Sequence, residues 1–318
     1  MDGLLELEDL SVHYKTLRGE VRAIEGVSLE IPEGETLGVV GETGCGKSTL
    51  GKAVLGVLPL GTRVGGHVRF RGQDLLALDE EALRELRGRD LALIFQDPMT
   101  RLNPLMTIDR HFVETIRAHE DVTDDEARER ARVSLTAMGI PDSRMKNFPH
   151  EFSGGMRQRI MIALALVLRP SLLVADEPTT SLDVIVEAGI LEILEDLKRT
   201  YKMSLLLITH NLGIVAEVCD RVAVLYAGRL VEIGSVRDIF ARPIHPYTRA
   251  LLKSIIHLET KELYSIDGSP PDLYAPPTGC RFHPRCPYAK DICRAEDPPL
   301  VEFRPGQFAS CHFGGDFL

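Results

Sequence analysis

The sequence predicts an α/β fold in which helices pack on a parallel sheet, followed by a smaller, loop-rich domain. Three observations carry this prediction. A glycine-rich turn at 41–49 joins an apolar segment to a helical one, and strand-like and helix-like segments alternate between residues 172 and 226. Such alternation is typical of parallel sheets covered by helices. After about Gly234 proline becomes frequent and regular strand periodicity disappears, which indicates a second domain.

The elements follow from the spacing of apolar residues along the chain. Strand-like residues from Leu5 onward lead to the segment 37–40, and apolar residues at helical spacing resume at 50–58. An acidic helix at 79–86 separates two short strands, the second of them at 91–95. The remaining expected elements are a strand at 172–175, a helix at 184–200, a strand at 204–209, a helix at 212–220 and a strand at 221–226.

The same pass predicts the domain organisation. We expect residues 1–235 to form the first domain, with a mostly helical part at about 97–168, and residues 236–318 to form the second. Within the helical part, the charge run at 120–132 has the pattern of a solvated helix face. The four cysteines of the second domain offer a way to compensate for a thin core.

Length and composition limit the function classes. The chain has 318 residues, a formal net charge of −10, 44% hydrophobic and 26% charged residues, which is ordinary for a soluble globular protein. Its most apolar stretch, 160–175, is interrupted by Arg169 and Pro170, so we expect no membrane span. No secretory signal is visible at the N-terminus, so we expect a cytosolic protein. The acidic balance argues against nucleic acid as a partner.

Residues 41–49, GETGCGKST, match the phosphate-binding loop (P-loop) and lie between an apolar strand and a helix, as that loop requires. Glycines let the backbone curl so that successive N–H groups face a β-phosphate, and the helix N-terminus adds positive partial charge. Lys47 would reach the β- and γ-phosphates, and the Ser48 hydroxyl would bind Mg²⁺. The expected ATP-binding residues are Gly41, Glu42, Thr43, Gly44, Cys45, Gly46, Lys47, Ser48 and Thr49.

An acidic element, SLLVADEP at 171–178, complements this loop. A buried strand that ends in Asp176 delivers a carboxylate where Mg²⁺ would sit, and Glu177 beside it is available to polarise a water. The pair predicts a nucleotide-hydrolysing site with Glu177 and Lys47 as catalytic residues.

The segment FSGGMRQR at 152–159 resembles the signature motif of ATP-binding-cassette (ABC) ATPases, whose usual form is Leu-Ser-Gly-Gly-Gln. This chain departs from that form at Phe152 and Met156. The resemblance implies a P-loop ABC ATPase fold, with a RecA-like core, an antiparallel β subdomain and a helical subdomain. It also implies that a second ABC ATPase subunit is needed, because each P-loop faces the partner's signature residues, here Ser153, Gly154, Gly155 and Met156.

The resemblance assigns further residues. Tyr14 lies where an aromatic ring stacks on adenine, and Gln96 corresponds to the glutamine that senses Mg²⁺ and the attacking water. His210 matches the histidine that contacts the γ-phosphate. The expected dimer loop consists of Ser181, Leu182 and Asp183.

The segment 241–255, ARPIHPYTRALLKSI, resembles the C-terminal region of oligopeptide and dipeptide importer ATPases. That branch implies an ATP-hydrolysing subunit on the cytoplasmic face of the cell membrane. Its implied partners are two membrane-spanning permease subunits, a second ATPase that is usually a different chain, and, indirectly, a substrate-binding protein. Relatives in this branch also handle nickel and oligosaccharides, and the sequence does not separate these cargoes.

The last forty residues concentrate four cysteines, Cys280, Cys286, Cys293 and Cys311. Four thiolates converging from loops suit an iron–sulfur cluster or a tetrahedral zinc, and disulfides or free thiols are a further alternative. The resemblance to the importer branch implies a [4Fe–4S] cluster on these residues. His283 and His312 are possible substitute ligands.

Two other function classes compete with transport. ABC ATPases of DNA repair or the ribosome normally carry a long coiled-coil insertion or a second cassette, and the chain between Lys47 and Ser153 has room for neither. A non-catalytic iron–sulfur regulatory protein would not need the intact pair Glu177 and His210. We therefore expect an ATPase that powers peptide import.

Overall fold

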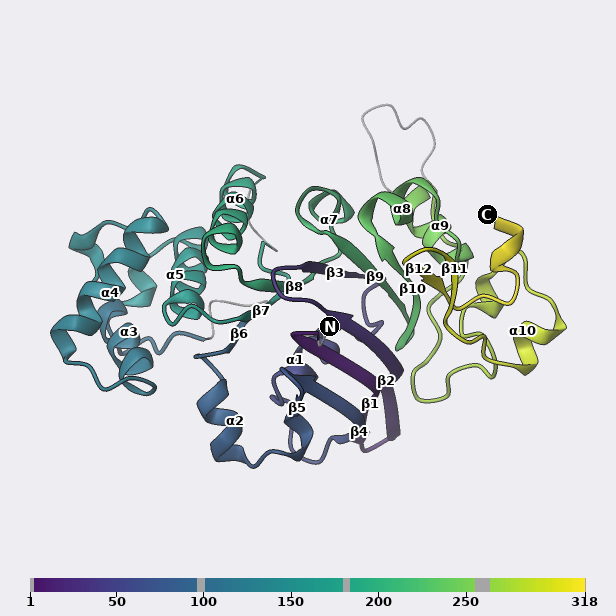
Figure 1. The fold of residues 1–318 in the computed structure, drawn as a ribbon, viewed down its shortest axis with the longest axis horizontal. Coiled ribbons are helices and arrows are strands. Elements are labelled where there is room, and N and C mark those ends of the chain that lie inside the picture. Colours follow the sequence, from purple (N-terminus) through teal and green to yellow (C-terminus); the bar gives the residue numbers. More distant parts are fainter. Residues whose placement is uncertain (1–2, 96–100, 180–183, 255–263, 318) are drawn as a thin grey trace. The chain divides into compact units, whose positions relative to one another are not determined.

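The computed structural model describes residues 3–95, 101–179, 184–254 and 264–317 (Figure 1). The chain forms two compact units. Unit 1 combines Met1–Leu76 with Leu207–Leu318, and unit 2 is Ala77–Leu206.

Unit 1 contains an antiparallel sheet with the strand order β2-β1-β4-β5. Its strands are β1 (Leu5–Thr16), β2 (Gly19–Ile31), β4 (Arg63–Phe70) and β5 (Gln73–Asp74). In β1, Leu5 and Leu7 are buried, and the burial phase then shifts so that Leu10 and Val12 are buried. A register shift with Asp9 at φ 49° separates the two pairs, as expected of a β-bulge.

The strands of the second sheet that lie wholly in unit 1 follow the order β11-β12-β10-β9-β3. The strands are β3 (Thr36–Val40), β9 (Arg221–Tyr226), β10 (Arg229–Ser235), β11 (Val301–Arg304) and β12 (Gln307–Ala309). β3 pairs with β9 in parallel, and the other neighbours are antiparallel. Every residue of β3 is buried, as its continuous apolar pattern predicts.

Two strands of this sheet lie where the sequence predicts no regular strand structure. The sequence predicts no regular strands after about residue 235, but β11 and β12 form a hairpin, and β12 adds to the edge of β10. Each strand spans only a few residues and Pro305-Gly306 joins them, so the sequence shows too few alternating positions to be recognised. Pairing with β10 stabilises what the local pattern leaves undecided.

Five helices complete unit 1. They are α1 (Lys47–Val54), α7 (Leu212–Val218), α8 (Val236–Ala241), α9 (Pro246–Lys253) and α10 (Asp291–Ala295) among the described residues. The loop-rich C-terminal part packs on an aromatic group of Tyr226, Tyr247 and Phe282, whose ring centroids lie 4.5–5.4 Å apart. All three side chains are almost fully buried. This group, rather than regular secondary structure, forms the core of the region.

Unit 2 contains the parallel strands β6 (Leu91–Ile94) and β7 (Leu172–Asp176). The boundary between the units falls within β8 (Ser204–Ile208). The helices of unit 2 are α2 (Glu80–Leu86), α3 (Ile108–Arg117), α4 (Asp124–Ala137), α5 (Gly154–Leu166) and α6 (Val184–Tyr201). Together with the sheets of unit 1, these elements confirm the expected α/β class with an antiparallel sheet and a helical part.

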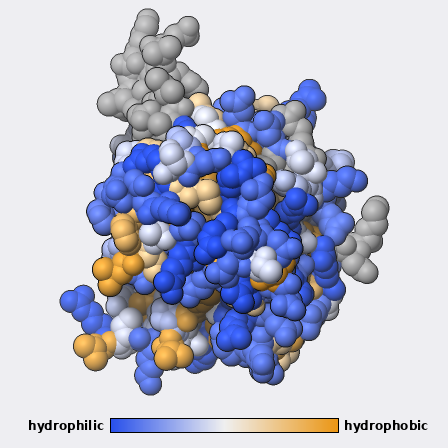
Figure 2. All heavy atoms as spheres, turned by 90° about the vertical axis from the view of Figure 1, so that its left-hand side faces the viewer, coloured by the Kyte–Doolittle hydropathy of each residue, from blue (hydrophilic) through white to orange (hydrophobic). Residues whose placement is uncertain are grey.

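The charge run at 120–132 lies mostly on α4 and confirms the interpretation of a solvated face. Ala127, Ala131 and Leu135 are its buried residues, one per helical turn, and the helix begins with a capping box between Thr123 and Glu126. The side of the molecule that carries α3 and α4 is mainly hydrophilic (Figure 2). No helix in the described part of the chain is long and apolar enough to cross a membrane.

Candidate nucleotide site

The glycines of the P-loop have backbone angles that other residues rarely adopt. Gly41, Gly44 and Gly46 have φ values of 151°, 82° and 107°. A Cβ on Gly41 would lie 2.2 Å from the carbonyl oxygen of Leu225, and one on Gly46 would lie 2.4 Å from that of Ala23. The surrounding backbone thus packs directly on the loop at these two positions, whereas a Cβ on Gly44 would meet nothing within 4 Å and would face open space.

Lys47 is the first residue of α1 and is buried, with 6% of its surface exposed. Its Nζ donates hydrogen bonds to the carbonyl oxygens of Gly41 at 2.8 Å and Glu42 at 3.2 Å, so the ammonium group lies against the curled loop. Gly46, the N-cap of α1, provides no side-chain hydrogen bond. The helix N-terminus and the lysine together provide positive charge and N–H donors of the kind that bind phosphate oxygens.

Tyr14 and Cys45 lie next to this loop. The Tyr14 hydroxyl, on β1, donates a hydrogen bond to Thr49 Oγ1 at 3.1 Å, which links the predicted adenine-stacking residue to the first turns of α1. Cys45 is 4% exposed, and burial raises the pKa of its thiol. Because its Sγ lies 2.7 Å from where a Gly41 Cβ would be, the thiol fills the space beneath the loop.

His210 follows β8 and is exposed. The backbone N–H of Thr209, the residue before His210, donates a hydrogen bond to the Val39 carbonyl at 3.3 Å. Val39 lies in β3, the strand that leads into the P-loop. Asn211 then caps α7 by accepting from the N–H groups of Gly213 and Ile214. His210 is therefore presented from the same end of this part of the fold as the P-loop.

In unit 2, Asp176 ends the fully buried strand β7 and is 6% exposed. The next residue, Glu177, has φ 49°, a left-handed conformation that is uncommon for glutamate. Such a conformation turns the chain sharply after the strand and presents two consecutive carboxylates at its C-terminal end, as the sequence predicts.

The segment 153–156 starts α5. Ser153 is the N-cap, and its side chain accepts a hydrogen bond from the Met156 N–H at 3.4 Å. The two residues that depart from the usual signature share one neighbour: the Arg144 guanidinium lies 4.2 Å from the Phe152 ring centroid and 3.5 Å from the Met156 sulfur. Their side chains thus form one local packing group beside the exposed Ser153 and Gly154.

Comparisons with known proteins agree with this geometry. Residues 24–180 match the family model described as ABC transporter, and residues 231–293 match the model described as oligopeptide/dipeptide transporter, C-terminal region. The oligopeptide transport ATP-binding protein OppD of Escherichia coli is 46% identical over 98% of this chain and 93% of its own length. The chain belongs to the ABC transporter ATPase family.

Two further similarities are informative about this ABC ATPase. The dipeptide transport ATP-binding protein DppD of Bacillus subtilis is 46% identical over 92% of this chain and 89% of its own length. The dimeric structure of the ATP-binding cassette MJ0796, in a post-hydrolysis state bound to ADP and Pi, has a TM-score of 0.67 and 25% identity. It covers 73% of this chain and 99% of its own. The expected P-loop ABC ATPase fold is confirmed.

Some predicted ABC residues lie outside the described part of the chain. They are Gln96 and the dimer-loop residues Ser181, Leu182 and Asp183. The assignments made for them by resemblance stay predictions.

The cysteines of the ABC chain's C-terminal region converge but form no ready metal site. Cys280, Cys286, Cys293 and Cys311 line one cavity of about 20 Å³, which holds about one water. Burial, followed by repulsion between neighbouring thiolates, raises the pKa of Cys280 to about 12 and that of Cys311 to about 11. All six cysteines are free thiols, and the described residues contain no group of three or more Cys, His, Asp or Glu that could hold a metal ion.

The two histidines considered as substitute ligands are engaged with backbone instead. The Nδ1 of His283 donates to the Cys280 carbonyl at 2.9 Å, and the Nε2 of His312 donates to the Glu296 carbonyl at 3.0 Å. The expectation of a metal centre is therefore not supported by the arrangement of the described residues. The four thiols present the donor set of a thiolate-ligated metal or cluster without its geometry.

Three residues that the sequence analysis did not assign hold the ABC site in place. Tyr247, from the His-Pro-Tyr motif at 245–247 within the segment 241–255, accepts a hydrogen bond from the Glu42 N–H. Arg285 forms an ion pair with the Glu42 side chain. In unit 2, the buried Gln158 of α5 donates from Nε2 to the Pro178 carbonyl at 2.6 Å. Because Gln158 lies close to the signature motif in the sequence, it could have been predicted as a residue of the site. No local sequence pattern predicts the contact between Glu42 and Arg285.

Proposed function

We propose that this ABC ATPase hydrolyses ATP to power the import of dipeptides or oligopeptides. The observation that carries the proposal is its similarity, over nearly the whole chain, to oligopeptide and dipeptide transport ATP-binding proteins, including the match of residues 231–293 to their C-terminal region. Nickel and oligosaccharides remain the alternative cargoes, because the ATPase subunit of such a transporter does not touch the cargo.

ATP binding uses the P-loop in this proposal. The N–H groups of residues 41–49 and the N-terminus of α1 hold the phosphates, Lys47 neutralises the β- and γ-phosphates, and Tyr14 stacks on adenine. The position of Lys47 at the start of α1, with its ammonium group against the curled loop, supports this assignment.

Hydrolysis requires an activated water and a stabilised γ-phosphate. Glu177 accepts a proton from the attacking water, and His210 donates a hydrogen bond to the γ-phosphate. Hard oxygen ligands from Ser48, Gln96 and Asp176 suit Mg²⁺, which supplies positive charge for the developing phosphate charge.

The ATPase acts with a second subunit. Ser153, Gly154, Gly155 and Met156 contact the ATP held by the partner's P-loop, and Ser181, Leu182 and Asp183 cross the dimer interface. The N-terminus of α5 lies at an exposed serine and glycine, which supports a role in contacting a ligand from another chain. We infer that the partner is a different ATPase chain, with a second copy of this chain as the alternative. ATP binding closes the pair, and hydrolysis reopens it.

We further propose a place and partners for this unit. Residues 1–235 form the nucleotide-binding domain, with a helical subdomain at about 97–168, and residues 236–318 form the C-terminal domain. The ATPase docks on two membrane-spanning permease subunits at the cytoplasmic face of the membrane. A substrate-binding protein delivers the cargo to those permeases.

The four cysteines carry a [4Fe–4S] cluster in this proposal, with Zn²⁺ as the alternative. Convergence of four thiols on one cavity supports it. Burial raises the pKa of these cysteines and so disfavours their thiolate forms, whereas a bound metal would stabilise the thiolates. A cluster would also need a larger cavity than the one of about 20 Å³ between the cysteines. Its test is the iron and acid-labile sulfide content of protein purified without oxygen. About four of each per chain, lost in a Cys286→Ser variant, would support the cluster.

The catalytic proposal is tested with Glu177→Gln in the full chain. We expect ATP binding to persist and phosphate release to fall by at least ~100-fold, the contribution of a general base. Unchanged phosphate release would remove the assignment.

Cargo is tested by reconstituting the chain with its permeases and a binding protein in vesicles. Stimulation of ATP hydrolysis by peptide-loaded binding protein supports peptide import. Stimulation by nickel or an oligosaccharide, with no stimulation by peptide, overturns it.

A further inference from the structure

The P-loop carries one acidic side chain, Glu42, in a loop whose function requires positive charge. ATP brings several negative charges to this loop, and a carboxylate there would repel them or compete with them for Lys47 and the loop N–H groups. The Lys47 ammonium lies 3.2 Å from the backbone carbonyl oxygen of Glu42, so residue 42 is next to the cation that the phosphates need. The position of the Glu42 carboxylate therefore matters for nucleotide binding.

Arg285 holds this carboxylate in a two-pronged ion pair. Its Nη1 donates to Glu42 Oε2 at 2.6 Å, and its Nη2 donates to Oε1 at 3.0 Å. The side chain of Arg285 is 5% exposed and that of Glu42 is 25% exposed, so solvent screens the pair only in part. Paired, forked contacts of this kind fix orientation as well as neutralise charge.

The remaining donors of Arg285 fix the guanidinium from its other side. Nε donates to the Asp267 carbonyl at 2.9 Å, Nη2 also donates to the Ile266 carbonyl at 3.2 Å, and Nη1 donates to the Tyr226 hydroxyl at 3.3 Å. The guanidinium carbon lies 5.8 Å from the centroid of the Tyr226 ring. Contacts on every side leave this arginine one orientation, toward Glu42.

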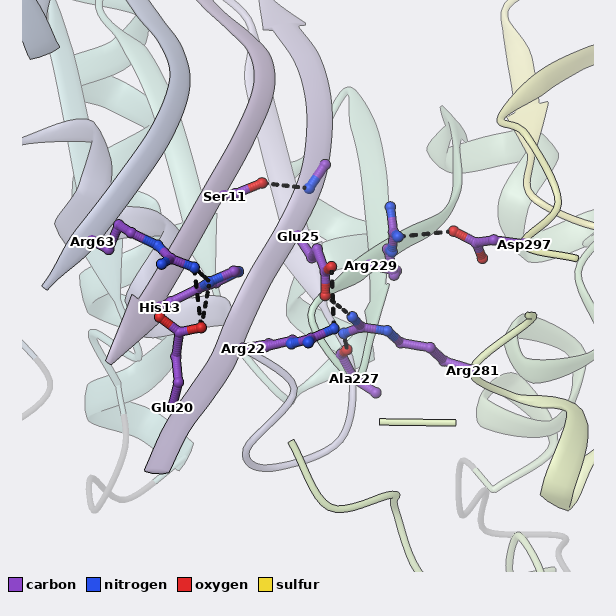
Figure 3. A network of polar contacts seen from close by, with 11 residues as sticks. Ser11, His13, Glu20, Arg22, Glu25, Arg63, Ala227, Arg229, Arg281 and Asp297 are labelled. Atoms are coloured by element: carbon purple, nitrogen blue, oxygen red, sulfur yellow. Dashed lines mark hydrogen bonds and ion pairs between the residues drawn. The ribbon is translucent and has the colours of Figure 1, made fainter. Parts of the chain in front are cut away.

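Other ion pairs also join the C-terminal region to the rest of unit 1, but none of these touches Glu42. Arg281 pairs with Glu25 of β2 and donates to the Ala227 carbonyl (Figure 3). Asp297 pairs with Arg229 of β10 at 3.0 Å (Figure 3). Like Arg285, these pairs connect the C-terminal region to the rest of unit 1, but they do not contact the P-loop residue Glu42.

We propose that Arg285 is a positioning residue for ATP binding, because it neutralises the Glu42 carboxylate and holds it away from the bound triphosphate. The inference rests on the proposed ATPase function and adds a role for the C-terminal domain. That domain supplies the positive charge that pairs with the Glu42 carboxylate, whereas Lys47, the cation of the P-loop itself, donates to the carbonyl oxygens of Gly41 and Glu42. Nucleotide affinity thus depends on a residue 243 positions away along the chain.

The test compares ATP binding and hydrolysis by the full chain carrying Arg285→Gln. We expect the Kd and KM for ATP to rise about tenfold, which corresponds to about 1.4 kcal/mol, while kcat at saturating ATP stays within about twofold. Added salt should narrow the difference, because the repulsion is electrostatic. An Arg285→Lys variant keeps the charge but not the forked contact, so its Kd for ATP should lie between that of the native chain and that of Arg285→Gln.

A second variant separates repulsion from loss of structure. In the double variant Glu42→Gln with Arg285→Gln, the carboxylate that repels ATP is gone, so ATP affinity should recover toward that of the native chain. A purely architectural role predicts no recovery, because the contacts of Arg285 with Ile266 and Asp267 remain lost. Asp297→Asn is the matched control, and it removes a pair of the same kind without changing the Kd.

The outcomes are distinguishable from failure of the proposed function. Native Kd in Arg285→Gln, or a double variant as weak as that single variant, would overturn the role of Arg285 and leave the ATPase assignment intact. A native chain that binds ATP without hydrolysing it would overturn the ATPase assignment, and the Kd comparison would still decide the role of Arg285.

Discussion

The Tyr247 hydroxyl accepts a hydrogen bond from the backbone N–H of Glu42 at 2.8 Å. This contact joins the start of α9 to the P-loop, and the tyrosine ring packs against Tyr226 and Phe282. Tyr247 is fully buried, so the packing around its ring holds the hydroxyl in place for this contact. The His-Pro-Tyr motif therefore has a physical connection to the nucleotide site.

Removing this hydroxyl should weaken nucleotide binding. In Tyr247→Phe the aromatic packing remains, but the Glu42 N–H is left without its acceptor, at a cost of about 1–3 kcal/mol for an unsatisfied buried group. Part of that cost should appear as an increased Kd for ATP, measured by titration with a fluorescent nucleotide. Tyr264→Phe, at a half-exposed tyrosine, is the control. An unchanged Kd in Tyr247→Phe would show that the loop keeps its shape without this bond.

Gly46 should tolerate no side chain. An alanine there would combine an unfavourable φ of 107° with a Cβ 2.4 Å from the Ala23 carbonyl oxygen. We expect Gly46→Ala to shift β2 or the loop and to lower ATP affinity by more than tenfold, since such strain costs about 1–3 kcal/mol and displaces the phosphate-binding N–H groups. Gly44→Ala isolates the effect of a positive φ without a clash, and it should impair binding less. Equal losses in both variants would contradict the steric argument.

Gln158 should affect hydrolysis rather than ATP binding. It is 3% exposed and anchors the Pro178 carbonyl, directly after Glu177. Gln158→Met keeps the volume and loses the hydrogen bond, so we expect kcat to fall several-fold, because an unanchored loop holds Glu177 less well, while the Kd for ATP changes little. The control Arg159→Met alters the next helix residue, which contacts Met138 instead. A kcat equal to that of the native chain would remove the positioning role.

Glu232 should make stability depend on pH. Its buried carboxylate accepts from the N–H groups of Ile244 and His245, both at 2.8 Å, and from Gln307 Nε2 at 2.9 Å. Burial nevertheless raises its pKa above the ordinary 4.5. The folded state then retains a proton that the unfolded chain releases, so this contribution is present below pH 4.5 and is lost as pH rises through the folded-state pKa.

The matching variant is Glu232→Gln. It replaces one acceptor oxygen by a donor that faces a backbone N–H or the Gln307 amide, and it should lower the free energy of unfolding by about 1–3 kcal/mol. Denaturant unfolding of both proteins, followed from pH 4 to pH 8, measures the difference. The slope assigned to Glu232 should be missing from the variant, and parallel curves for the two proteins would exclude Glu232 as its source.

Local patterns in the sequence determined much of the fold. Periodicity predicted the strand at 221–226 and the helix at 184–200, which the structure has at Arg221–Tyr226 and Val184–Tyr201. The P-loop was recognisable because its glycines, lysine and flanking strand are contiguous, and their spacing itself creates the phosphate cradle. β11 and β12 escaped prediction, because they are stabilised by pairing with each other and by the pairing of β12 with β10 rather than by a recognisable pattern of their own residues.

Tertiary structure decided how the C-terminal region bears on the site. The sequence placed Tyr247 in a family motif and Arg285 in a loop, and only folding brought both to Glu42. Folding likewise brings four cysteines around one cavity, but the described residues form no group that could hold a metal ion. The four cysteines in the sequence had suggested a cluster. Spacing along a chain fixes neighbours within a helix, strand or turn. Contacts between distant segments depend on how whole elements pack, and no local pattern records that.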